Sequence, residues 1–124
     1  MIINLTQHNA SPEQVAAGVV DVPAELKSDL SALLTFSTLP TKEELSEAAM
    51  KVAAMAVIYC QGSDAPAAMI GGAPFFMAPL EMALRHYGIK PLYAFSERVS
   101  EEQEQTDGSI RKGNIFKHKG FVEV

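Results

Sequence analysis

The stretch "AAMIGGAPFFMAPLEMAL", residues 67–84, contains the turn from which the rest of the chain can be placed. A short apolar run stops at Gly71-Gly72, Pro74 follows, and a second apolar segment then begins with a different spacing. Glycine lets the backbone turn sharply and lets another group approach closely, and proline suits the first turn of a helix. The pattern predicts a buried strand, a tight loop and a helix that ends at Tyr87-Gly88.

Pro79 leaves two interpretations of this helix open. A proline inside a helix removes one backbone hydrogen bond, so a helix from Pro74 would be kinked at Pro79. Alternatively the helix starts near Pro79, and "APFFM" is a turn that lines a crevice.

Strands and helices alternate on both sides of this turn. Ser11 with Gln14, and Thr41 with Glu44, have the spacing of capping boxes, which begin helices. The helix predicted over Thr41–Gln61 has a stripe of small apolar residues suited to packing on a sheet. Strands are predicted at Ile2–Gln7, Val19–Val22, Ala67–Ile70 and Leu92–Phe95.

The last part of the chain is charged and has hairpin chemistry. Asp107-Gly108 is a favoured two-residue turn, and it would place Glu104 opposite Arg111, an acidic arm against a basic one. Because strands that alternate with helices form parallel sheets, the chain is predicted to be an α/β protein. The expected fold is one small Rossmann-like parallel sheet flanked by helices over residues 1–124, with a C-terminal antiparallel β-hairpin over residues 96–124.

The composition and charge of the chain argue against several classes of function. The 124 residues carry a formal net charge of −5, whereas proteins that bind duplex nucleic acid are usually basic. Cys60 is the single cysteine, and its place on an alanine-rich helix favours a buried thiol in a reducing cytoplasm. No segment has the pattern of a membrane span, and no metal motif or cofactor motif is present. We expect a cytoplasmic protein without a membrane or duplex partner.

The candidate site follows from the predicted sheet. Ligands of such sheets bind beyond the carboxyl ends of the strands, where residues 6–8, 71–74 and 96–98 should meet. The N-terminus of the helix after the glycines would favour an anion there, and Arg98 can grip phosphate with two hydrogen bonds. "IGGAP" is neither the dinucleotide motif nor the Walker loop, so a plain connector remains the alternative.

Three segments together resemble small CRISPR-associated Rossmann-fold proteins of the ring-nuclease type. They are "NLTQHNASPEQ", "IGGAPFFM" and "GIKPLYAFSERVSEEQEQTDGSIRKGNIFKHKGF". The match covers the two ends well and the middle loosely. Gln7 stands before His8 where Ser or Thr is expected in that family, which puts a catalytic role of the first loop in doubt.

The resemblance implies antiviral defence, a homodimer and a cyclic oligoadenylate bound across its two-fold axis. Cleavage of the ring would need no metal, because the 2′-hydroxyl of the RNA is the nucleophile. The residues expected at the site are, as catalytic groups, His8, Ser96 and Arg98, and, as ligand contacts, Thr6, Gln7, Gly71, Gly72, Ala73, Lys117 and His118.

Two other functions compete with binding of a small anionic nucleotide. The charged hairpin could be the working surface of a non-catalytic protein-interaction module in a phage or mobile-element defence system. A hydrolase using Cys60 or Ser96 with a histidine is a third hypothesis, but the chain lacks a nucleophile elbow.

Overall fold

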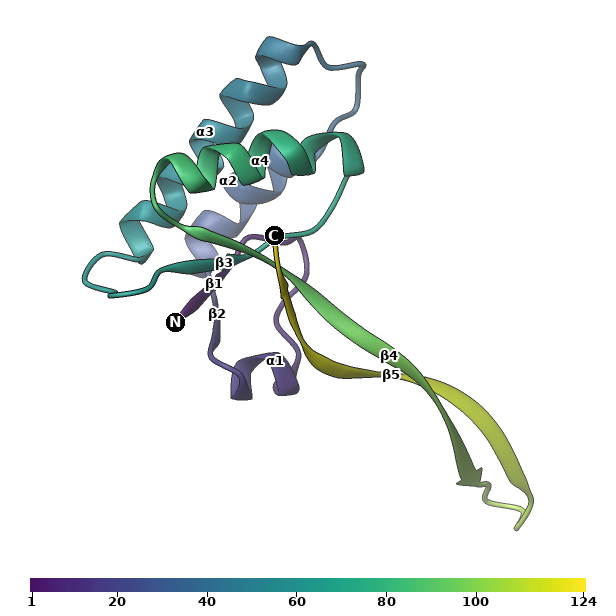
Figure 1. Cartoon of the computed structure of the whole chain (residues 1–124). Coiled ribbons are helices and arrows are strands. Elements are labelled where there is room, and N and C mark those ends of the chain that lie inside the picture. Colours follow the sequence, from purple (N-terminus) through teal and green to yellow (C-terminus); the bar gives the residue numbers. More distant parts are fainter.

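A computed structural model describes the backbone of residues 1–124 and the side chains of all but residues 101, 103 and 114. Strands and helices alternate as predicted, and the protein is an α/β fold around one five-stranded sheet of order β2-β1-β3-β4-β5 (Figure 1). The elements are β1 (Ile2–Asn4), α1 (Pro12–Ala16), β2 (Val19–Asp21), α2 (Ala24–Leu34), α3 (Lys42–Tyr59), β3 (Ala67–Met69), α4 (Pro74–His86), β4 (Lys90–Glu104) and β5 (Ile110–Glu123).

The helices cover the two faces of the sheet unequally. Strands β1 to β4 are parallel, and β5 runs antiparallel to β4. Since β2 and β3 lie on opposite sides of β1, right-handed connections place α1 on one face and α2, α3 and α4 on the other (Figure 1). The five-residue α1 buries none of its residues, so the main core lies under the three longer helices.

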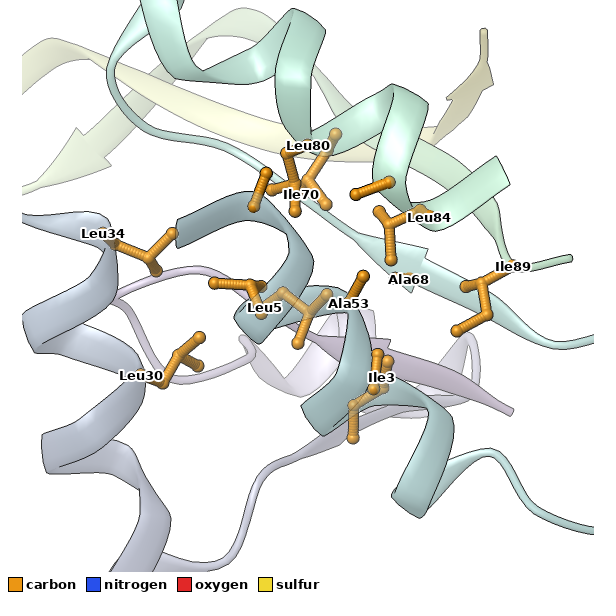
Figure 2. Packing of buried hydrophobic residues seen from close by; sticks show 14 of the residues in the cluster. Ile3, Leu5, Leu30, Leu34, Ala53, Ala68, Ile70, Leu80, Leu84 and Ile89 are labelled. Carbon is orange, nitrogen blue, oxygen red and sulfur yellow. The ribbon is translucent and has the colours of Figure 1, made fainter. Parts of the chain in front are cut away.

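That core is built by aliphatic side chains of β1 and β3 and the apolar stripes of α2, α3 and α4 (Figure 2). The small residues predicted to face the sheet from the long helix do so, because Ala49, Ala53 and Ala56 are buried. Thr41 and Glu44 form the expected capping box at the start of α3. Cys60 ends α3 as a buried free thiol, and burial raises its pKa, which opposes a role as nucleophile.

Helix α4 starts at Pro74, so Pro79 lies inside it. The alternative start near Pro79 is wrong, and so is its consequence that "APFFM" forms a crevice-lining turn. Phe76 and Met77 instead point into the core, and burial of these large side chains offsets the loss of one backbone hydrogen bond at Pro79.

The fourth strand does not end at Phe95 as predicted. It continues to Glu104 and is itself the first arm of the hairpin, which extends away from the rest of the domain (Figure 1). A bulge interrupts the ladder, because Phe95 pairs with Gly120 while Ser96 pairs with His118, which leaves Lys119 unpaired. Ser96 and Arg98 therefore lie along a strand and not in a loop after one.

The hairpin turns at the predicted place with a different register. Gln105 N–H donates to Ser109 O at 2.7 Å, and Gly108 N–H donates to Gln105 O at 3.0 Å, so the loop includes Thr106 as well as Asp107-Gly108. This is the type I turn followed by a left-handed residue, here Gly108 at φ +85°. The extra loop residue shifts the arms by one position, so the predicted pair of Glu104 with Arg111 is wrong: Glu104 lies opposite Ile110.

Candidate functional site

The carboxyl edge of the sheet carries a cavity of about 630 Å³. This volume is in the range of small-molecule sites, about 300–1,000 Å³. Three chain segments meet at it: the loop after β1, the glycine loop after β3, and β4 at Tyr93 and Ala94. Its lining is Thr6, Gln7, His8, Asn9, Gln14, Leu34, Thr35, Phe36, Met69, Ile70, Gly71, Gly72, Ala73, Tyr93 and Ala94.

Two of the three segments predicted to converge do so. Thr6, Gln7 and His8 line the cavity together with the glycine loop, Gly71, Gly72 and Ala73. The third segment reaches it through residues of β4 that precede the ones predicted, because the strand passes the sheet edge without ending.

The four other expected residues lie on the hairpin, outside the lining of this cavity as the described side chains form it. Ser96 pairs with His118, and Arg98 pairs with Phe116, where its guanidinium carbon lies 5.4 Å from the ring centroid. Lys117 lies opposite Glu97, whose carboxylate contacts Lys119 at 3.3 Å. Glu97 thus faces the basic arm of the hairpin.

The loop after β1 is held by the buried side chain of Asn4. Its Nδ2 donates to His8 O and to Asp21 Oδ1, both at 2.7 Å. Its Oδ1 accepts from the backbone N–H of Thr6 at 2.9 Å and from the Thr6 hydroxyl at 2.7 Å. Both the N–H₂ group and the carbonyl oxygen of this side chain are therefore hydrogen-bonded, and these bonds bend the chain so that His8 faces the cavity.

Asp21 is the second anchor of the same loop. It accepts from Ala10 N–H at 3.0 Å, and its other oxygen lies 3.9 Å from Lys27 Nζ. Burial acts to raise the pKa of Asp21, but the hydrogen bonds from Asn4 and Ala10 and the charge of Lys27 together hold that pKa below its ordinary value. Lys27 also donates to Asn9 Oδ1, so the polar loop has cross-links to β2 and α2.

Gln7 makes the link to the far side of the cavity. Its Nε2 donates to Thr35 Oγ1 at 2.9 Å, and the Thr35 hydroxyl in turn donates to Ser31 O at 2.7 Å. The Gln7 amide, which stands where the resembled family has Ser or Thr, therefore has a structural partner at the end of α2.

The two positions of the glycine loop differ in whether their backbone conformation requires glycine. Gly72 has φ +141°, where side chains are strained, whereas a Cβ on Gly71 would meet Thr6 Cγ2 at an ordinary 3.7 Å. Only the second position therefore needs glycine for its backbone. Helix α4 starts directly after it, and its N-cap Ala73 offers no side-chain hydrogen bond to the first turn.

Sequence reasoning missed several residues of the site. Asn4 is 3% exposed, and a polar residue inside "MIINL" was the available signal for a buried polar contact. Tyr93 could have been found from the alternation of "PLYAF", which sends it to the same side as Pro91. Phe36 and Gln14 had no local signal, because only the tertiary fold brings them to the sheet edge.

No group of three or more His, Cys, Asp or Glu side chains is placed to hold a metal ion among the residues that the structure describes. Over the same residues, none of the helices is long and apolar enough to cross a bilayer.

The glycine loop gives a matched pair of variants. Gly72→Ala should lower the free energy of unfolding by about 1–3 kcal/mol, because alanine is strained at that φ. Gly71→Ala should change it by less than about 0.5 kcal/mol. Urea unfolding of both variants measures the difference, and equal losses would contradict the role given to Gly72.

Asp21 makes the stability depend on pH. Since its pKa is lowered in the folded state, its contribution is complete above its ordinary pKa of 3.8 and is lost as pH falls below that value. Asp21→Asn should therefore be less stable than the wild type at pH 6, and the gap should narrow below about pH 4. Urea unfolding at a series of pH values tests this, with exposed Asp29→Asn as the control for loss of one negative charge. A gap that stays constant down to pH 2.5 would contradict the assignment.

Comparisons with known proteins show which family the chain belongs to. No curated protein and no solved structure matches the chain. A family model does match, over residues 1–122, nearly the whole length. By this match, the chain belongs to the Uncharacterized protein MJ1673 family.

Proposed function

We propose that this protein binds a small anionic nucleotide in the cavity at the carboxyl edge of its sheet. The observation that carries the proposal is the convergence of the Thr6–Asn9 loop and the glycine loop on one cavity of about 630 Å³. The cavity lies where α/β sheets bind ligands, and it combines apolar walls with a few polar groups, as ligand sites do.

The charge of the lining restricts how an anion would be held. Among the described residues of the lining, none is Lys, Arg, Asp or Glu. The donors for a phosphate are the backbone N–H groups of the glycine loop, His8, and the side-chain amides of Gln7 and Asn9. The start of α4 adds little, because Pro74 has no N–H and the N–H of Phe76 already donates to Ala73 O at 3.0 Å. Lys27 is a cation at the rim, because it donates to Asn9 Oδ1 of the lining. Arg98 and Lys117 lie further along the hairpin and on opposite faces of it, since Arg98 pairs with Phe116, the neighbour of Lys117.

Cyclic oligoadenylate is the candidate ligand, on the strength of the resemblance to ring nucleases. In metal-independent cleavage, a base removes the proton of a 2′-hydroxyl, whose oxygen attacks the adjacent phosphorus. The bond to the 5′-oxygen breaks, this oxygen takes up a proton from water, and the products are a 2′,3′-cyclic phosphate and a 5′-hydroxyl. His8, exposed at the cavity and held by the Asn4 network, is the residue that we assign as this base.

A thermal-shift screen with cyclic and linear oligoadenylates and common nucleotides tests binding, because a ligand of the native state raises the melting temperature. His8→Ala should then slow ring cleavage about 10²–10⁴-fold, with the fold intact because its side chain is exposed. His86→Ala, an exposed histidine on α4, is the matched control. No shift with any nucleotide would contradict the binding proposal, and wild-type cleavage by His8→Ala would contradict the assigned base.

Arg98→Ala reports in the same assay whether the ligand reaches the hairpin. A ligand confined to the cavity leaves the affinity of this variant unchanged, which is the expected result. A loss of about 1.5–3 kcal/mol, the range for a charged hydrogen bond, would place Arg98 in contact with the ligand.

An interaction module is the second candidate function, and the exposed side chains of the hairpin favour it. Phe116 is 67% exposed, Phe95 is also exposed, and both lie on a two-stranded ribbon that extends from the domain (Figure 1). Two-stranded ribbons are marginally stable by themselves, so a partner protein would order this one. A screen without any nucleotide binding would favour this function over the first.

We also propose a two-fold homodimer, the commonest assembly. On the outer side of α4, Phe75 and Met82 are exposed two turns apart, and Met82 is 70% exposed. A second copy would remove this apolar surface from water.

Light scattering at micromolar concentration should give twice the chain mass of 13.4 kDa. Met82→Lys should shift the assembly toward the monomer, whereas Leu39→Lys, at an exposed loop residue, should not. A wild-type monomer at every concentration would contradict the dimer.

A further inference from the structure

Tyr93 of β4 lines the cavity, and its hydroxyl is bonded on the helix side. The hydroxyl donates to Glu81 Oε2 of α4 at 2.5 Å, while the guanidinium of Arg85 donates to Glu81 Oε1 at 3.3 Å. Tyr93 is half-buried and packs against the core. Two α4 side chains thus hold the phenol in one position.

This arrangement determines whether a ligand would contact the hydroxyl or the ring of Tyr93. Burial raises the pKa of the phenol, and the hydrogen bond to Glu81 and the charge of Glu81 raise it further, so the group remains a donor to Glu81. Since its one O–H is used in that bond, Tyr93 has no donor left for the cavity and presents its ring there.

A second ring lines the same cavity. Phe36, just after α2, has its centroid 5.3 Å from that of Phe75 and 5.2 Å from that of Phe76, both with tilted or edge-on contact. These contacts fix Phe36 against α4. The cavity therefore combines two fixed aromatic side chains with the polar groups of Gln7, His8 and Asn9, and without a charged side chain in its described lining.

We propose that the ring of Tyr93 is the surface on which this site binds the base of its nucleotide, with Glu81 and Arg85 as positioning residues. Stacking on an aromatic side chain needs no hydrogen-bond readout and suits any planar base. This inference rests on the proposed function and adds which part of the ligand goes where: the base to the aromatic wall, and the phosphate to the amides of the glycine loop.

The small number of tyrosines and the lack of tryptophan allow stacking on Tyr93 to be followed by fluorescence. The chain contains no tryptophan, and its tyrosines are Tyr59, Tyr87 and Tyr93. In the double variant Tyr59→Phe/Tyr87→Phe, tyrosine emission comes from Tyr93 alone. Titration with adenosine, which has the base but no phosphate, should quench this emission on binding. Ribose 5-phosphate, which has the phosphate but no base, should leave it unchanged.

Calorimetry with adenosine 5′-monophosphate then distinguishes the contribution of the Tyr93 ring from that of Glu81, which holds its hydroxyl. Tyr93→Leu should weaken binding about tenfold to a hundredfold, the loss typical of one stacked base. Tyr93→Phe keeps the ring but loses its bond to Glu81, so it should bind as Glu81→Ala does, more tightly than Tyr93→Leu and more weakly than the wild type. Glu81→Gln, which retains an acceptor for the hydroxyl, should bind more tightly than Glu81→Ala. Tyr87→Leu, at an exposed tyrosine outside the cavity, is the control.

The outcomes separate this inference from the proposed function. If adenosine 5′-monophosphate binds but adenosine does not quench Tyr93, or if Tyr93→Leu binds as the wild type does, the base lies elsewhere and the inference is overturned. If neither the nucleotide nor the nucleoside binds, the proposed function and the inference fail together. Should Tyr93→Leu not fold, the quenching experiment still decides the question.

Discussion

The side-chain amide of Asn4 connects the end of β1 to nearly every other part of the candidate site. It is buried at the sheet edge and makes four hydrogen bonds, to Thr6, His8 and Asp21. A buried amide without these partners would be costly, so the loop after β1 has to adopt the conformation that satisfies it. The position of His8 at the cavity follows from this side chain, and its hydrogen bond to Asp21 acts with Ala10 and Lys27 to lower the pKa of that carboxyl.

The hairpin is tied to the same region from the opposite direction. At the bulge beside Lys119, the backbone N–H of His118 donates to Glu13 Oε2 of α1 at 3.1 Å. The neighbouring Gln14 completes the capping box of α1 and lines the cavity. The short helix α1, which buries none of its residues, is therefore bonded to the hairpin through Glu13 and places Gln14 at the cavity.

The chemistry of the cavity differs from what the overall charge would lead one to expect. The chain has a net charge of −5, and the described lining of the cavity holds no Lys, Arg, Asp or Glu. One cation, Lys27, contacts this lining by donating to Asn9 Oδ1. Under the proposed function, recognition in the cavity would depend on amide groups and aromatic rings. Such a site would discriminate by shape and by planarity more than by charge.

What the sequence determined by itself was local. The capping boxes at Ser11 and Thr41, the order of strands and helices, and the place of the hairpin turn were predictable, because each depends on residues within a few positions of one another. The convergence of the His8 loop with the glycine loop was also predictable, since parallel strands present their carboxyl ends at one edge.

Only the tertiary structure decided the contacts between distant residues. The register of the hairpin depended on whether Thr106 joined the loop, a difference of one residue that changes every pair along the arms. Pro79 was kept inside α4 by the burial of Phe76 and Met77 beneath it. The bonds of Gln7 to Thr35 and of Tyr93 to Glu81 join side chains 28 and 12 positions apart. Such pairs form because packing brings their elements together, and no local pattern of residues specifies them.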